Sequence, residues 1–360
     1  MSPVVKIVAL FIVAALLVLG AARSCAATFT QRLIGVDAAY VGTDALTYQN
    51  GSVWWSNFLG EMWQIDPVSG NVTATINLTM AGSGSARPTI VSDTIDGFIW
   101  IPNDQFGSNQ IAKLNQNGTL TAVITTPSYP LFIWYDSNTG DLWRNSGLSN
   151  NLYKVNKTTG ADSVTLAIGI ADETGVTFDA AGNAWVVNGS TTMRKITPAG
   201  VITLHTVTTP LGNAPIKATY DAARNTVWLQ TKGVGNSAEL VEWDIATLAI
   251  TQSLTLANLS TASVQPLVLN AATGRPWILD THNETMTAYT PSPLAVYATG
   301  GTDPLTDNLY GQMGVSTDGQ CGYAINAGNV EQAVREFCLA VSVASQPRIF
   351  VVNQPTVSHK

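Results

Sequence analysis

Short runs of alternating apolar and polar residues recur along most of this chain, and turns rich in Gly, Asn, Asp and Pro separate them. Examples are "MWQIDP", "LYKVNK", "MRKITP" and "MTAYTP". Alternation with a period of two is typical of half-buried β-strands, whereas amphipathic helices repeat every 3.6 residues. Helical spacing is almost absent outside one segment near the C-terminus. The pattern therefore predicts an all-β protein.

A longer repeat organises these strands. An aromatic residue follows a turn, mostly as Gly-x-x-Trp, at Trp54, Trp100, Trp143, Trp185, Trp228 and Trp277, and a degenerate copy ends at Tyr323. The intervals run from 42 to 49 residues. A period in the forties with turn residues before each aromatic indicates four-stranded propeller blades. We expect these tryptophans to belong to the core, because an aromatic at blade spacing is normally buried.

The ends of the chain predict how the ring closes. Thr28–Gly35 has the pattern of an outer strand, although no blade precedes it, and Arg348–Thr356 resembles a third strand with no fourth after it. The two ends would together complete one blade, which removes exposed sheet edges. We predict a seven-bladed β-propeller over residues 27–356 as a single domain, with an N-terminal strand closing the last blade and a tail at 357–360.

One segment breaks the repeat. Within about residues 328–345, apolar side chains recur at helical spacing, and Asn329 could cap a helix with Gln332 three residues later. The spaced residues are Val330, Ala333, Val334, Phe337, Cys338 and Val341. We expect a helical insertion in blade seven. It would either cover the mouth of a pocket or serve only as packing.

The N-terminal residues indicate export. Lys6 is followed by an apolar run from Ile7 to Leu19 and then by small residues near Ala26 and Ala27, which is the order of a secretory signal peptide. We expect residues 1–26 to be removed, leaving a secreted protein with no stable membrane span. An uncleaved anchor is the alternative, although the run is short for a span of ~20 apolar residues.

Cysteine usage agrees with an oxidising compartment. Cleavage would remove Cys25 and leave Cys321 and Cys338, which we expect to form one disulfide, two separate buried thiols being the alternative. Eight Asn-x-Ser/Thr sequons are candidate glycosylation sites. They begin at Asn50, Asn71, Asn77, Asn117, Asn156, Asn188, Asn258 and Asn283.

Charge excludes one class of partner. Only 11% of residues are charged and the net charge is −7, so a nucleic-acid-binding basic face is not expected. The chain lacks the G-x-S-x-G, HExxH and CxxC motifs, and its Gly-rich segment at Ala81–Ala86 is not followed by a helix. Familiar signatures of nucleophilic, zinc and phosphate chemistry are therefore missing.

The repeat units resemble those of a known group of propellers. Units such as "FDAAGNAWVVNGSTTMRKITPAGVI" are similar to those of the NHL, SMP-30 and streptogramin-lyase-like propellers, and the count of seven units favours the last of these. The resemblance implies an exported propeller whose central depression holds a ligand. It does not carry over catalysis, because the residues after the tryptophans, such as "WSN", "IPN" and "VVN", lack the family's acidic and histidine pattern.

Candidate binding residues come from the loops that follow the Trp strands and from the connections between blades, because that face of a propeller usually carries the site. We single out Glu61, Asp104 and Lys232 there, with Trp134 and Tyr135 as extra aromatics, besides Trp55, on which a sugar could stack. The carboxylates of this acidic rim could hold Ca²⁺ or Mg²⁺, although no cofactor is required by the pattern. Solvated loop carboxylates are the simpler interpretation.

The sharpest catalytic candidate is "LDTHNET", in which Asp280, His282 and Glu284 alternate. A histidine oriented by a carboxylate can act as a general base near neutral pH. A glycan on Asn283 would crowd such a site, and an ordinary exposed histidine is the alternative.

Two functions follow. The first is a secreted binding or scaffold module that holds an extracellular protein, glycan or small ligand without catalysis. The second is a lyase or hydrolase that uses His282 on a polysaccharide or a cyclic ester.

Overall fold

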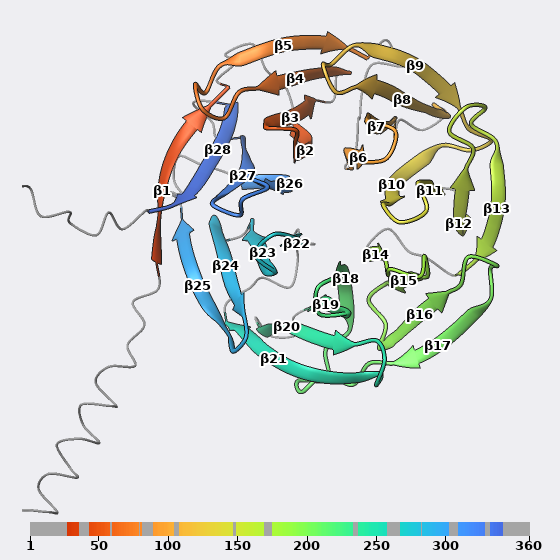
Figure 1. Cartoon of the computed structure of the whole chain (residues 1–360), viewed down its shortest axis with the longest axis vertical. Helices are drawn as coiled ribbons and strands as arrows, with labels where there is room; N and C mark the ends of the chain where they lie inside the picture. Colours follow the sequence, from red (N-terminus) through yellow and green to blue (C-terminus); the bar gives the residue numbers. More distant parts are fainter. Residues whose placement is uncertain are drawn as a thin grey trace, which may run out of the picture.

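The computed structural model describes residues 27–35, 43–57, 60–78, 80, 89–103, 108–146, 149–168, 175–232, 237–257, 267–281, 283–301, 309–327 and 332–340. These residues form 28 β-strands and no helix, arranged as seven four-stranded blades around a central axis (Figure 1). Within the described residues, no helix is long and apolar enough to cross a membrane. The predicted all-β, seven-bladed architecture is confirmed.

Six blades consist of four successive strands each, and blade seven combines β26, β27 and β28 with the N-terminal strand β1. The first strands, nearest the axis, are β2 (Thr43–Gln49), β6 (Val91–Asp93), β10 (Pro130–Asp136), β14 (Gly175–Phe178), β18 (Pro215–Asp221), β22 (Leu267–Asn270) and β26 (Leu309–Val315). The second strands are β3 (Ser52–Asn57), β7 (Phe98–Asn103), β11 (Asp141–Ser146), β15 (Ala184–Val187), β19 (Thr226–Thr231), β23 (Arg275–Asp280) and β27 (Cys321–Ala327). The third strands are β4 (Glu61–Ile65), β8 (Gln110–Asn115), β12 (Ser149–Val155), β16 (Thr192–Ile196), β20 (Ser237–Asp244), β24 (Thr285–Pro291) and β28 (Gln332–Leu339). The outer strands are β5 (Val72–Asn77), β9 (Leu120–Thr125), β13 (Asp162–Ala167), β17 (Ile202–Thr206), β21 (Ala249–Ala257), β25 (Leu294–Gly301) and β1 (Ala27–Ile34).

Backbone requirements explain some of the small residues. Asn50 and Gly51 both have positive φ, 49° and 75°, and form the two-residue turn between β2 and β3. Asn and Gly adopt that conformation at the least cost, which accounts for the "NG" pair. Gly314 serves a different purpose, because a Cβ atom there would lie 2.6 Å from the backbone nitrogen of Tyr48 on β2. The inner strands of blades seven and one can therefore approach closely.

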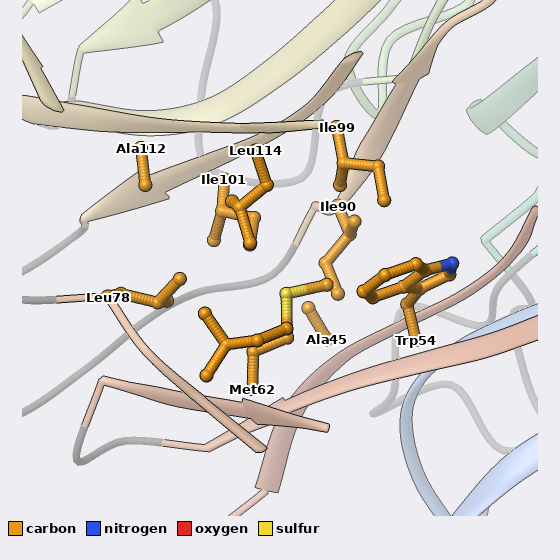
Figure 2. Close-up of a cluster of buried hydrophobic side chains, with 10 residues drawn as sticks. Ala45, Trp54, Met62, Leu78, Ile90, Ile99, Ile101, Ala112 and Leu114 are labelled. Carbon is orange, nitrogen blue, oxygen red and sulfur yellow. The ribbon is translucent and has the colours of Figure 1, made fainter. Parts of the chain in front are cut away.

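The core lies between the blades. Among the described residues there are seven clusters of buried apolar side chains, one for each pair of neighbouring blades. In the cluster between blades one and two, Trp54 and Met62 pack against Ile90, Ile99 and Leu114 (Figure 2). Each repeat aromatic enters the interface with the following blade, so the prediction that the tryptophan column is core is confirmed.

The N-terminal strand closes the ring. β1 pairs antiparallel with β28, in a register that runs from Phe29 opposite Leu339 to Ile34 opposite Val334. Its first two residues also pair in parallel with β25 of blade six. Closure by an N-terminal outer strand is therefore confirmed. The additional pairing with β25 joins the last two blades into one eight-stranded sheet.

The predicted helical insertion is wrong. Gln332–Leu339 is strand β28, the third strand of blade seven, and it is paired on both edges, with β27 and with β1. Ala333, Val334 and Phe337 are all buried. Because β28 is buried on both faces, its apolar residues do not alternate with polar ones, and their order also satisfies helical spacing. The segment forms a strand and not a helix because it is hydrogen-bonded to a neighbouring strand along both edges.

The third-strand assignment of Arg348–Thr356 is wrong for the same reason, because β28 already holds that position. The segment itself lies outside the described residues, as do the predicted signal segment and the predicted tail. The predicted disulfide between Cys321 and Cys338 is present. It joins opposed residues of β27 and β28 instead of pinning a helix to the blade.

We expect the disulfide to stabilise the closing blade. The two cysteines are 17 residues apart, and a crosslink over a loop of that size contributes about 3 kcal/mol, mainly by restricting the unfolded chain. The Cys321→Ser, Cys338→Ser double variant should lose about that much unfolding free energy in a denaturant titration. Equal stability of variant and wild type would contradict this role for the crosslink.

Candidate functional site

A central cavity of about 600 Å³ opens between the inner strands of blades two to six. The turns between first and second strands form the surrounding face, which we call the inner-turn face. The lining residues are Ile90, Val91, Ser92, Thr94, Trp134, Tyr135, Ser137, Asn138, Val176, Thr177, Phe178, Tyr220, Asp221, Ala222, Ala223, Val268, Leu269 and Ala271. The sequence analysis expected the site at the opposite face, whose loops lie mostly outside the described residues.

Aromatic side chains form much of the cavity wall. The predicted binding residues Trp134 and Tyr135 lie on β10, line the cavity and are half-buried. Phe178 and Tyr220 line it from the next two blades. The ring of Trp134 stacks on that of Phe132, with centroids 6.0 Å apart and planes 19° apart. Trp55, the other aromatic singled out from the sequence, is fully buried in the core.

Tyr135 takes part in a charged cluster between blades two and three. Burial, together with a hydrogen bond to the carboxylate of Asp93, raises the pKa of its phenol to about 12. The phenol oxygen also accepts a hydrogen bond from the backbone amide of Ile95, at 3.3 Å. The hydroxyl therefore remains protonated at neutral pH, and its hydrogen bonds hold the ring in place at the cavity wall.

Lys157 completes this cluster. Its ammonium lies 2.7 Å from Oδ2 of Asp93 and also pairs with Asp96. Burial opposes ionisation of Asp93, but hydrogen bonds from Lys157, Tyr135, the Asp96 amide and Trp100 outweigh it and lower the pKa. One ammonium thus faces two carboxylates, so the cluster keeps a net charge of −1, while the buried carboxylate of Asp93 is directly paired with Lys157.

Sequence reasoning missed a column of buried carboxylates. Asp93, Asp136 and Asp221 end the first strands of their blades, Asp179 directly follows that of blade four, and all four are almost fully buried. Three of them accept the indole N–H of their own blade's tryptophan, as Asp179 does from Trp185 at 2.9 Å. An Asp six or seven residues before four of the six repeat tryptophans was the available signal.

The same carboxylates hold the turns of the inner-turn face. Asp221 lines the cavity, yet its Oδ1 accepts the amides of Ala223 and Arg224, and its Oδ2 accepts the indole of Trp228. Hydrogen bonds to an ionised acceptor are stronger than neutral ones. These carboxylates therefore hold the turns in place through hydrogen bonds.

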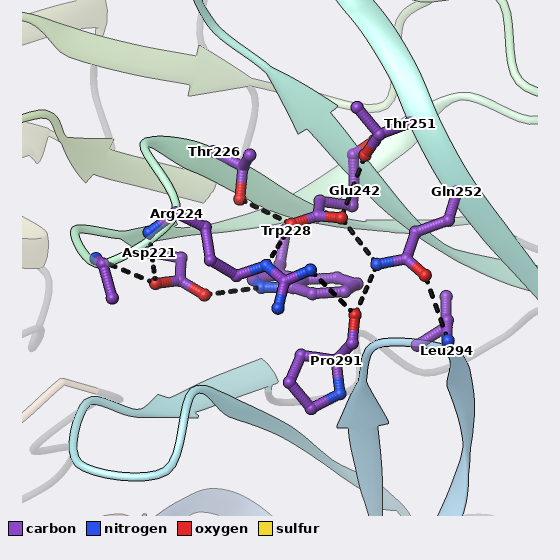
Figure 3. A network of polar contacts seen from close by, with 10 residues as sticks. Asp221, Arg224, Thr226, Trp228, Glu242, Thr251, Gln252, Pro291 and Leu294 are labelled. Atoms are coloured by element: carbon purple, nitrogen blue, oxygen red, sulfur yellow. Dashed lines mark hydrogen bonds and ion pairs between the residues drawn. The ribbon is translucent and has the colours of Figure 1, made fainter.

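A polar network next to this turn joins blade five to blade six (Figure 3). Glu242 accepts hydrogen bonds from Arg224 at 2.7 Å, from Thr226 and from Gln252. Arg224 and Gln252 also donate to the carbonyl of Pro291 in blade six. The network therefore anchors one side of the cavity mouth from outside the cavity.

The sequence-predicted catalytic residues lie elsewhere. Asp280 and Glu284 are buried at the turn between β23 and β24, which belongs to the face opposite the inner-turn face. The Asp280 carboxylate accepts hydrogen bonds from the backbone and side-chain amides of Asn283. His282 lies outside the described residues. The two carboxylates thus lie at the same turn, and the histidine between them stays a prediction.

The remaining binding candidates are dispersed. Glu61 is half-buried at the start of β4, Lys232 is exposed after β19, and Asp104 lies outside the described residues. Within the described part of the chain, the group of metal-ligating side chains with ligand atoms within 4.8 Å of one another is Cys321, Glu336 and Cys338. Both sulfurs belong to the disulfide, and Glu336 pairs with Arg32, so these residues do not fit a metal site.

The candidate glycosylation sites differ in accessibility. Asn50, Asn71, Asn77, Asn117 and Asn156 are exposed on blades one to three. Asn188 is half-buried, and Asn258 lies outside the described residues. Asn283 is exposed, but the nitrogen that would carry the glycan donates to Asp280. The five exposed sites are therefore the better acceptors.

No protein-family model and no curated protein matches this sequence. Solved structures do match. Selenomethionine-substituted virginiamycin B lyase from Staphylococcus aureus aligns with a TM-score of 0.64 and 15% identity, over 87% of this chain and 100% of that chain. A streptogramin B lyase structure aligns with a TM-score of 0.63 and 15% identity, over 87% of this chain and 98% of that chain. A catalytically inactive virginiamycin B lyase from Staphylococcus aureus, with quinupristin, aligns with a TM-score of 0.65 and 16% identity, over 87% of this chain and 100% of that chain. The fold is that of a streptogramin-lyase-like propeller, as the repeat units suggested.

The Glu242 network makes a pH prediction. Burial opposes ionisation of Glu242, but hydrogen bonds from Gln252, Arg224 and the two threonines outweigh it and lower the pKa. Its stabilising contribution is therefore complete above the unfolded value, about 4.3, and is lost as pH falls through the lower folded value. We expect Glu242→Gln to cost about 3 kcal/mol at pH 7 and to weaken the acid dependence of stability.

The measurement is chemical denaturation between neutral and acidic pH. Asp141→Asn is the matched control, because Asp141 forms a partly exposed ion pair with Lys154 and such pairs contribute little. An unchanged acid dependence in Glu242→Gln would contradict the prediction.

Proposed function

We propose that this protein is a secreted propeller that binds an uncharged ligand in its central cavity and acts by binding instead of catalysis. The observation that carries the proposal is the cavity itself. Its volume of about 600 Å³ falls within the range of ~300–1,000 Å³ typical of small-molecule sites. Aromatic rings line its wall, and the carboxylate of Asp221 in that lining is bound to turn amides and an indole.

The lining also suggests the class of ligand. Trp134, Tyr135 and Tyr220 offer ring surface for an apolar face, whereas Thr94, Ser137 and Asn138 at the turns offer neutral hydrogen-bonding groups. An apolar face combined with hydroxyls on its edge is the pattern of a sugar ring. We infer that a neutral glycan unit, or a small molecule with the same division of surfaces, is the ligand.

Export is part of the same proposal. The disulfide between Cys321 and Cys338 suits an oxidising compartment, and the N-terminal segment has the composition of a signal peptide. Five exposed sequons on blades one to three would carry glycans in a eukaryotic secretory pathway. An extracellular protein remains an alternative occupant of the cavity mouth.

Replacement of Trp134 tests the binding site. If a neutral saccharide stacks on this ring, Trp134→Ala should weaken its binding by roughly tenfold, because aromatic contacts contribute about 1.5 kcal/mol beyond burial. Titration calorimetry against a panel of neutral oligosaccharides measures the effect. Tyr297→Ala on β25 is the control, because this tyrosine stacks on Arg275 and is not part of the cavity lining. Equal loss in both variants would contradict a role for the cavity.

A lyase is the second candidate, and the likeness in fold to streptogramin B lyases favours it. In this case the chemistry would lie on the opposite face, where the buried carboxylates of Asp280 and Glu284 flank His282 in sequence. We expect an enzyme of this kind to consume virginiamycin B or a related cyclic ester, and the His282→Ala variant to lose at least ~100-fold of that rate.

Chromatography of the substrate after incubation with purified protein measures this activity. The Trp134→Ala variant is the matched control, because it alters the cavity on the inner-turn face and leaves the β23–β24 turn intact. Activity in the wild type that persists in His282→Ala would contradict the assignment of the histidine. Unchanged substrate with wild type would leave binding as the function.

A further inference from the structure

The outer strand of blade four, β17, has an unusual surface. Ile202 and Leu204 lie on the same side of the strand with 39% and 63% of their surface exposed, and Val201 just before it is 60% exposed. By contrast, the exposed positions of the outer strands β9, β13 and β21 are occupied by Thr, Ser and Ala, and β5 and β25 each expose a single valine, Val72 and Val296. Blade four thus presents a cluster of large aliphatic side chains where the outer strands of those blades present one or none.

The edge of β17 is also unprotected. It ends its four-stranded sheet, so alternate backbone N–H and C=O groups point away from β16. Its register with β16 runs without interruption from Thr192 opposite Thr206 to Ile196 opposite Ile202. The outer strands β5, β9, β13, β21 and β25 each have a β-bulge or register shift against their third strand. Bulges are a common protection of edge strands, and β17 lacks one.

Charge does not protect this edge either. No Lys, Arg, Asp or Glu occurs from Val201 to Val207. His205 stacks on Trp185, with ring centroids 5.6 Å apart, and burial together with the nearby Lys195 lowers its pKa. The strand is therefore uncharged at neutral pH, in a chain whose net charge is −7.

We propose that β17 is the contact between two copies of this chain, paired antiparallel about a two-fold axis at Thr203. In that register Ile202 of one copy faces Leu204 of the other, on both sides of the axis. The order Ile-Thr-Leu is close to symmetric, so the strand complements itself, as an isologous interface requires. Two acidic chains can meet there without like-charge repulsion.

Two further features agree with a second copy as the occupant. None of the eight sequons falls within β17, and the five exposed ones lie on blades one to three, so glycans would leave this edge uncovered. The ring is already closed by β1, so no strand of the described chain remains to cover β17. Pairing two copies would extend the blade-four sheet from four strands to eight.

A single-cysteine crosslink tests the register. Residues opposed in an antiparallel pair have Cα atoms about 4.5–5.5 Å apart, within the reach of a disulfide. Thr203→Cys should therefore form a disulfide-linked dimer of twice the monomer mass on mild oxidation of the secreted protein. Thr73→Cys on β5 is the control for random collision, because Thr73 is equally exposed on an outer strand of blade one. Equal crosslinking of both variants, or none of Thr203→Cys, would overturn the proposal.

Sedimentation velocity provides the second measurement. We expect the wild type to show a concentration-dependent monomer–dimer equilibrium, and Ile202→Lys with Leu204→Lys to weaken it by roughly 100-fold. Val72→Lys with Thr75→Lys on β5 should leave it unchanged. Circular dichroism confirms that both variants fold. A monomeric wild type, or a dimer that survives the β17 substitutions, overturns the proposal.

A truncation after Ala340 tests the remaining alternative, which is that the C-terminal segment of a second copy makes the contact. This variant lacks residues 341–360 but retains every described strand. Loss of the dimer in the truncated chain, with retention in the β17 double-lysine variant, would assign the contact to the C-terminal segment of a second copy and not to β17.

Discussion

The need to bury both faces of every sheet governs this structure. A propeller blade is apolar on two sides, and neither side can be buried except against a neighbouring blade, so an open row of blades would leave two faces in water. The repeat aromatic of each blade enters the interface with the next, and Tyr323 does so between blades seven and one, where it stacks on Tyr48 with centroids 5.5 Å apart. Seven equivalent interfaces follow from this one requirement.

The buried aspartates connect this core to the cavity. Each accepts amides of a turn at the inner-turn face, and Asp93, Asp179 and Asp221 also accept the indole of the core tryptophan. The position of the cavity wall is therefore coupled to the packing between blades. Because the oxygens of Asp221 are occupied in this way, its presence in the lining adds rigidity more than reactivity. The wall of the cavity is therefore rigid and largely aromatic, and the carboxylate in its lining is already engaged in hydrogen bonds.

Much of the fold follows from the spacing of the aromatics, because each blade must repeat the same turn and the same core position. The errors arise where local pattern is ambiguous. Phe337 and Val334 satisfy helical spacing, yet β27 and β1 offer hydrogen bonds to both edges of that segment, which a local pattern does not reveal. Trp134 and Tyr135 were singled out because they are extra to the repeat, and both line the cavity, while their role in binding stays a prediction. The aspartate column was overlooked because an Asp before a turn is ordinary, and only the indole contact shows its second purpose.

The closing strand has a consequence for the way the chain folds. Thr30 bonds to the carbonyl of Cys338, 308 positions away, and the partner strand β28 is among the last to be synthesised. β1 therefore has to stay unpaired while six blades form behind it, and the final blade can assemble only when both ends of the chain meet. Ring closure thus joins residues with a very large separation in sequence, and non-local strand pairing of this kind is intrinsically slow because the entropy of loop closure must be overcome first.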